Sequence, residues 1–158
     1  MGTVYSTVYD GFLKQLRGDK EFFNYKNVSE IDVQTLVNDH CLKLLGQSID
    51  FIYDFGSPQI NFYNKDDVAK QFNIDLTDKE IGILSNLMYY FYMMESRNKL
   101  KILGLTFSSQ ELSVFSPSNE RRSYEEMLNN IKKDNEYMVI NYLNKDRVSK
   151  KLKCSNFG

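Results

Sequence analysis

The feature that most constrains the fold is a run of eight consecutive apolar residues, Leu87 to Met94, inside a predicted helix over about residues 78–101. Successive side chains of a helix are 100° apart, so such a run points in every direction. A surface helix has one apolar stripe, whereas a helix that is apolar most of the way round is buried on several sides. The sequence therefore leaves two alternatives: a central helix in a monomeric bundle, or a helix that also contacts another subunit.

The apolar residues of this helix form more than one stripe. The first stripe consists of Ile81, Leu84, Met88, Phe91 and Tyr92. The second stripe, roughly a quarter-turn away, consists of Ile83, Leu87, Tyr90 and Met94. Tyr89, Met93 and Leu100 lie on a further side. The candidate subunit-interface residues are accordingly Tyr89, Tyr90, Met93, Met94 and Leu100.

The start of this helix is marked by a capping box. Thr77 can accept a hydrogen bond from a free N–H of the first turn, and Glu80 can reach back to the Thr77 N–H. Asp78 and Glu80 lie at the positive end of the helix dipole, and Arg97 and Lys99 lie near its negative end. We assign Thr77 a structural role only.

Three further helices are predicted from apolar residues at the spacing i, i+3, i+4. They cover about residues 3–16, 29–53 with Ser29 as N-cap, and a last helix that starts near Ser116 or Ser118 and ends near Leu143. Residues 66–71 could form one helical turn. Gly104 should end the long helix, and residues 105–114 alternate weakly. The predicted fold is therefore mainly α: a bundle of about four helices with a short extended arm or β-hairpin between the last two.

The C-terminal arm, residues 144–158, differs in charge from the rest of the chain. It has five basic residues and one acid, a net charge of +4; since the whole chain carries −1, residues 1–143 carry −5. Such an arm is either a solvated end or a docking element for an acidic partner or DNA. We divide the chain into a helical domain, residues 1–143, and this arm. The candidate docking residues are Lys145, Arg147, Lys150, Lys151 and Lys153.

Nothing in the sequence points to an enzyme. The one histidine, His40, has no evident nucleophile and carboxylate around it, so we interpret it as structural. The eight glycines form no phosphate-binding loop, and no Cys/His spacing suits a metal. We expect no cofactor, no metal site and no catalytic residue. Nor do we expect a signal peptide or a membrane-spanning helix, because no apolar run is long enough to cross a bilayer.

Three segments carry a resemblance to a known family. FNIDLTDKEIGILSNLMYYFYM, followed after a gap by FSPSNERRSYEEMLNNIKKDNEYMVINYL, resembles the head–tail connector (adaptor or neck) proteins of tailed bacteriophages. The start, TVYSTVYDGFLKQL, is similar to the opening helix of that group. The resemblance covers most of the chain, with residues 25–67 the least clear.

The resemblance implies a structural virion protein of the phage neck. In that family many copies, usually twelve, form a ring below the portal protein. The ring extends the channel through which DNA passes and offers a platform for the next neck or tail protein. The implied partners are further copies of this chain, the portal, the next neck or tail protein, and passing DNA without sequence specificity, but no membrane. The implied location is the virion neck, after assembly in the cytoplasm of the bacterial host.

Two other functions stay open. The chain could be a small cytoplasmic phage-encoded regulator that binds a host or phage partner. It could also be a nucleic-acid binder that uses its basic arm, in which case its affinity for DNA should fall steeply with salt.

Overall fold

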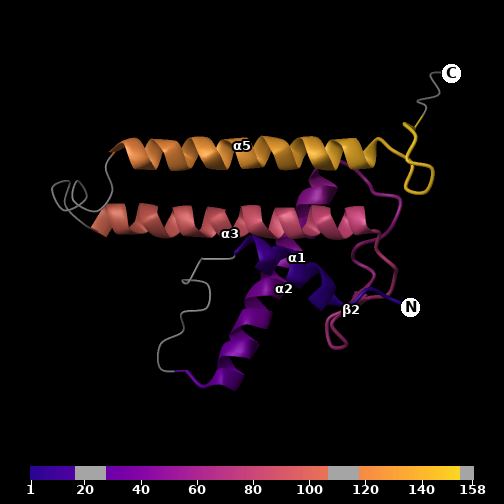
Figure 1. Ribbon diagram of the computed structural model, residues 1–158, viewed down its shortest axis with the longest axis horizontal. Helices are drawn as coiled ribbons and strands as arrows, with labels where there is room; N and C mark the ends of the chain where they lie inside the picture. Colours follow the sequence, from indigo (N-terminus) through magenta and orange to yellow (C-terminus); the bar gives the residue numbers. More distant parts are fainter. Residues whose placement is uncertain (17–27, 107–117, 154–158) are drawn as a thin grey trace.

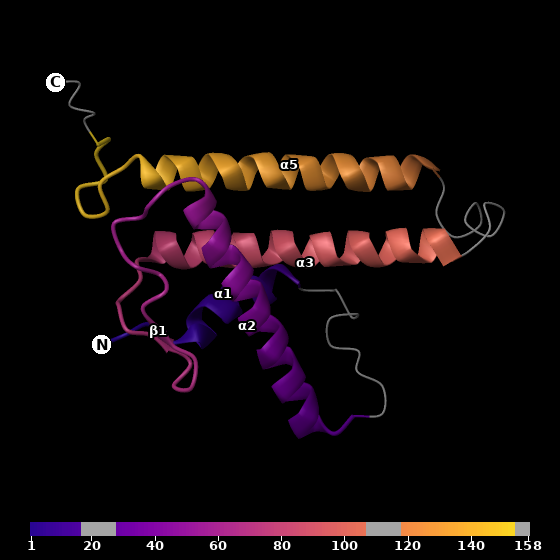
Figure 2. The same ribbon diagram turned by 180° about the vertical axis from the view of Figure 1, so that it is seen from behind.

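The computed structural model describes residues 1–16, 28–106 and 118–153, which form four helices and one small hairpin. The helices are α1 (Tyr5–Gln15), α2 (Glu30–Asp54), α3 (Asp78–Thr106) and α5 (Ser118–Leu143). Helices α3 and α5 lie side by side and run antiparallel, while α1 and α2 cross α3 (Figures 1 and 2). The predicted class, mainly α, is confirmed.

Helix α3 is the centre of the bundle, because α1, α2 and α5 all make their principal helix contacts with it. On one side Ser85 donates a hydrogen bond of 2.9 Å to a backbone carbonyl of α1. On another side the ring of Phe51 in α2 packs edge-on against Phe91, with 5.9 Å between centroids. On a third side the Tyr124 hydroxyl of α5 donates to the Met93 carbonyl at 3.0 Å. Three neighbouring helices therefore cover much of the broad apolar surface formed by the described side chains of α3 within one subunit.

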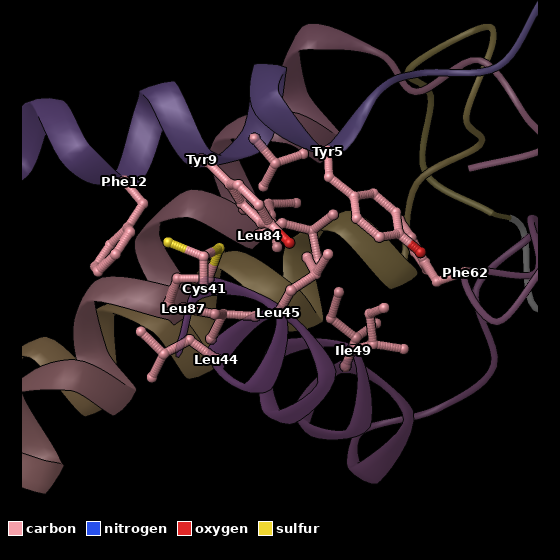
Figure 3. Packing of buried hydrophobic residues seen from close by; sticks show 14 of the residues in the cluster. Tyr5, Tyr9, Phe12, Cys41, Leu44, Leu45, Ile49, Phe62, Leu84 and Leu87 are labelled. Atoms are coloured by element: carbon pink, nitrogen blue, oxygen red, sulfur yellow. The ribbon is translucent and has the colours of Figure 1, made fainter. Parts of the chain in front are cut away.

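The apolar stripes of α1 and α2 meet α3 in one continuous core (Figure 3). Its largest fully buried side chains include two aromatic residues of α1, Tyr5 and Phe12. Leu44 and Ile49 contribute from α2, and Leu84 contributes from α3. These residues keep the helical spacing seen in the sequence, which is why the positions of the helices could be predicted.

Local caps set where α2 and α3 begin. The Ser29 hydroxyl accepts a hydrogen bond from the Asp32 N–H at 3.3 Å, as predicted for the start of α2. At the start of α3 the Thr77 N–H donates to the Glu80 carboxylate at 2.7 Å, and the Glu80 N–H donates to the Thr77 hydroxyl at 3.3 Å. The predicted capping box is confirmed.

Helices α1 and α3 approach each other closely at Gly11. A Cβ atom at this position would lie 2.4 Å from the Ser85 hydroxyl oxygen. That hydroxyl oxygen lies 2.9 Å from the carbonyl oxygens of both Val8 and Ile81, which share its one proton. A larger residue here would therefore force the Ser85 side chain or the two helices to shift.

A two-stranded antiparallel hairpin joins α2 to α3. Its strands are β1 (Lys65–Asp66) and β2 (Gln71–Phe72), and Lys65 pairs with Phe72. Gln71 also bridges to Val4, just before α1, so the hairpin fixes the N-terminal segment.

The connection inside this hairpin corrects the helical turn expected at residues 66–71. One Asp66 carboxylate oxygen accepts hydrogen bonds from the N–H groups of Val68 and Ala69, both at 2.9 Å. Lys70 then has a positive φ of 53°. Both features are typical of turns. The aspartate bonds replace helical hydrogen bonds of the backbone, and a positive φ does not occur within a right-handed helix.

Helix α3 is longer than expected, since it continues past Gly104 to Thr106. A glycine inside a helix costs only about 1 kcal/mol relative to alanine, so it does not by itself end a helix. The predicted arm or hairpin between the last two helices falls mostly on residues 107–117, which lie outside the described residues. Among the described helices none is both long enough and apolar enough to cross a membrane.

Candidate functional site

The first part of the C-terminal arm folds into a compact loop at the end of α5, which we call the C-terminal loop (residues 144–153; Figure 1). Lys145 and Leu152 form an antiparallel bridge across it. The Lys153 N–H returns to donate to the Asn144 carbonyl at 2.8 Å. The backbone of the loop is therefore closed on itself.

The loop is fastened to the helices by an ion pair that we call the latch, formed by Arg147 and Glu80. The Arg147 Nε donates to one Glu80 carboxylate oxygen at 2.7 Å, and a terminal nitrogen of Arg147 donates to the other at 3.0 Å. The Glu80 side chain is fully buried, whereas that of Arg147 is 25% exposed. The Tyr142 hydroxyl donates to the same carboxylate at 2.7 Å, and the Thr77 N–H is its fourth donor. Glu80 thus joins the start of α3, the end of α5 and the C-terminal loop.

The latch favours the ionised form of Glu80. Burial alone raises the pKa of this carboxyl group, because it removes water from the charge. The hydrogen bonds from Arg147, the Thr77 backbone and Tyr142 outweigh burial and hold the pKa below its usual range. The same geometry raises the pKa of the Tyr142 hydroxyl, through burial and through its bond to Glu80. The carboxylate is therefore fully charged and fully satisfied at neutral pH.

Further hydrogen bonds hold the loop on its outer side. Arg147 also donates to the Asp75 carbonyl at 2.6 Å, and its backbone N–H donates to the Gln59 side chain at 2.6 Å. Gln59 in turn donates to the Asp146 carboxylate at 3.1 Å. Hydrogen bonds from the Ser149 backbone, from Gln59 and from the rest of the loop lower the pKa of Asp146 to about 2. The loop is consequently a preformed surface rather than a free chain.

The five predicted docking residues have different surroundings. Arg147 is engaged inside the chain, and Lys145 is half-buried, while the exposed residues are Lys150, Lys151 and Lys153. Lys79 of α3, which sequence reasoning did not include, lies near Lys145 and Lys150, with its Nζ 5.9 Å from the ring centroid of Tyr142. Burial, Lys145 and Lys150 lower the pKa of Lys79, so these cations repel one another. The loop therefore presents a concentrated positive charge at one end of the bundle.

The five predicted interface residues of α3 do not share one side of the helix: the Tyr124 hydroxyl of α5 reaches Met93, whereas the Tyr90 ring lies toward α2, 6.2 Å from that of Phe51. Tyr90 is buried, and Tyr89 and Met93 are partly buried and pack against the core. Met94 is half-buried, and the side chain of Leu100 lies outside the described residues. Much of this surface is thus already used inside one subunit.

His40 ties α2 to α3. Its Nε2 lies 2.6 Å from one carboxylate oxygen of Glu95, and the Lys43 Nζ lies 2.6 Å from the other. Burial raises the pKa of Glu95, but the hydrogen bonds from Lys43 and His40 outweigh burial and lower it. Within the described ranges, no three His, Cys, Asp or Glu side chains are arranged to hold a metal ion.

A second surface feature, which the sequence reasoning missed, is an open groove of about 320 Å³ between α2 and α3. We call it the aromatic groove; it is lined by Gln47, Asp50, Phe51, Asp54, Tyr90 and Phe91. Phe55 extends the apolar surface, with its ring centroid 5.1 Å from that of Phe51 and 38% of its surface exposed. Both aspartates are exposed at the rim. The available sequence signal was an Asp-Phe dipeptide that occurs twice, four residues apart, at the end of α2: Asp50-Phe51 and Asp54-Phe55.

The chain was compared with models of protein families, with curated proteins and with solved structures, and none of them matches it.

Proposed function

We propose that this chain is a structural subunit of a head–tail connector ring in the neck of a tailed bacteriophage. The observation that carries the proposal is the C-terminal loop: a basic surface that is fastened to the end of the bundle by the buried Arg147–Glu80 latch. A docking element held in advance loses little conformational freedom on binding, so more of the contact energy contributes to affinity. In this proposal the loop docks onto an acidic surface of the assembled neck.

Two other observations support the proposal. The resemblance to connector proteins includes the segment that forms the capping box and central helix α3, and the segment that forms α5. The loop and the aromatic groove are also two unlike surfaces on one subunit. A ring needs unlike surfaces, because each subunit presents a different face to each of its two neighbours.

The first test is whether the protein occurs in purified virions of a phage whose genome encodes this chain. Quantitative mass spectrometry should find it in a fixed ratio to the portal protein, with about twelve copies if the family pattern holds. A chain that is abundant in the infected cell and absent from virions would refute the proposal and favour the cytoplasmic regulator.

A second test separates docking from folding. Changing Lys150, Lys151 and Lys153 together to glutamate reverses the exposed charge but leaves Arg147 and the latch in place. Electron microscopy of the lysate should then show filled heads and separate tails, because connectors of this family join after DNA packaging. A control changes two lysines of α5 that are also exposed, Lys132 and Lys133, to glutamate and should leave whole particles in normal yield.

A further inference from the structure

We infer that the acidic surface to which the C-terminal loop docks is the aromatic groove of a neighbouring copy of the same chain. The inference rests on the proposed ring and names the partner of its docking loop. Specifically, Leu152 enters the groove between α2 and α3, and Lys151 and Lys153 pair with the two aspartates at its rim.

The groove has the size and chemistry of a binding site. Its volume of about 320 Å³ is sufficient for a small ligand or a single large side chain. Its floor is aromatic, with the Phe51 and Phe91 ring centroids 5.9 Å apart. Its rim carries two exposed negative charges, Asp50 and Asp54. Binding clefts of proteins are typically apolar with a few well-placed polar groups, so this groove suits an apolar side chain flanked by cations.

The loop presents that combination. Leu152 is 69% exposed although it belongs to the bridge with Lys145, so it is an apolar side chain held in an outward position. Lys151 and Lys153, its neighbours in the sequence, are both exposed, and in an extended segment their side chains leave the backbone on the face opposite to Leu152. Lysine carries its charge on a flexible four-carbon stem, so both charges can turn toward the surface that receives Leu152.

The spacing of the two lysines also matches that of the two aspartates. Asp50 and Asp54 are one helical turn apart, which places their Cβ atoms about 6 Å from each other. Lys151 and Lys153 are two residues apart in an extended segment, a separation of about 6.6 Å at about 3.3 Å per residue. Each lysine can thus reach its own aspartate.

A neighbouring copy fits this groove better than the loop of the same chain. Within one subunit, none of the residues that line the groove belongs to the loop. To leave its place the loop would have to break the latch to Glu80 and the bond from Lys153 to Asn144. The loop projects from the end of the bundle, whereas α2 crosses α3 along its length (Figure 2). The groove is lined by residues of these two helices. Contacts between such unlike surfaces run head to tail, and they form a ring when the rotation from one subunit to the next closes.

Disulfide trapping tests the contact, using the native Cys154, which directly follows Lys153. Gln47→Cys places a second thiol in the groove and keeps both aspartates. Cys41 does not interfere at pH 8, since it is buried and its thiol pKa is raised to about 12. Under mild oxidation the variant should form a ladder of dimers, trimers and larger species on non-reducing gels, because every subunit carries one loop and one groove.

Two controls isolate this geometry. Asp39 is exposed on the same helix, two turns before position 47, so Asp39→Cys should give no ladder with Cys154. Gln47→Cys combined with Cys154→Ser should give dimers at most. A disulfide within one chain, seen as a faster-migrating monomer, would overturn the inference because the loop would then occupy its own groove. A complete absence of cross-links at millimolar protein would overturn it as well.

Charge exchange tests the recognition itself, in the Gln47→Cys background. Asp54→Lys alone and Lys151→Glu alone should each lower the ladder yield at least tenfold, and the two together should restore most of it. Equal yields in all variants would mean random collision and overturn the inference. If Lys151→Glu abolished DNA binding but left the ladder unchanged, the partner of the loop would be nucleic acid instead.

The result is separable from that of the virion test. If the chain is found in virions but its charge variants cross-link like the parent, the proposed function stands and this contact is wrong. If the chain forms a specific ladder but is absent from virions, this contact stands and the connector function is wrong.

Discussion

Arg147→Ala should destabilise the protein by removing one partner of the latch. The change deletes two charge-assisted hydrogen bonds of 2.7 and 3.0 Å and leaves the fully buried Glu80 carboxylate with only two donors. Breaking a fully buried ion pair costs about 3–5 kcal/mol. Because the Arg147 side chain is 25% exposed, water can reach part of the vacated space. We therefore expect a loss of about 2–3 kcal/mol in the free energy of unfolding.

Thermal unfolding followed by circular dichroism measures this change. For a domain of this size about 1 kcal/mol corresponds to about 2–4 °C, so the melting temperature should fall by about 4–12 °C. Lys150→Ala is the matched control, since it removes a charge from the same loop at an exposed position and should change stability by less than about 0.5 kcal/mol.

A double-mutant cycle decides whether the loss comes from the pair. Glu80→Gln removes the charge that Arg147 neutralises, so Arg147→Ala should cost at least about 1 kcal/mol less in that background. The reasoning is refuted if Arg147→Ala melts within about 1 °C of Lys150→Ala, or if the two latch substitutions are additive.

Three further predictions concern stability. Thr77→Ala should cost about 1 kcal/mol through loss of the helix cap, as measured by urea unfolding; an unchanged midpoint would contradict the observed capping box. The pKa of Glu80 is lower in the folded state than in the unfolded state, so its contribution to the free energy of unfolding is complete above about pH 4.5 and is lost as the pH falls through the folded-state pKa. Between pH 7 and pH 3, the free energy of unfolding should therefore fall less for Glu80→Gln than for wild type. Gly11→Ala should destabilise although alanine is the better helix former by about 1 kcal/mol, because its Cβ would meet the Ser85 hydroxyl; a raised melting temperature would show that the helices can separate at little cost.

The parts of the fold that depend on neighbouring residues could be predicted from the sequence. The caps at Ser29 and Thr77 use partners three residues away, so their chemistry is visible in a short window. The apolar periodicity likewise located the helices. It also showed that α3 is apolar on several sides, but it could not show that α5 covers the side that carries Tyr89 and Met93.

The latch could not be predicted in the same way. Glu80 and Arg147 are 67 residues apart in sequence, and a capping box fully explains a glutamate at position 80 without any further partner. The basic composition of the arm also does not show which residue, here Arg147, pairs within the subunit and which lysines stay exposed to solvent. The groove depends on how α2 crosses α3, and helical periodicity does not fix that crossing.

The central position of α3 has a consequence for synthesis on the ribosome. The first two helices emerge before the helix that is their principal partner, which ends only at Thr106. At about 5–20 residues per second, the roughly 50 residues from the end of α2 to the end of α3 take about 3–10 s to add. During that interval the apolar faces of α1 and α2 have no completed core. The nascent chain should therefore stay open to chaperones and proteases until α3 leaves the exit tunnel, after which its first three helices can collapse together.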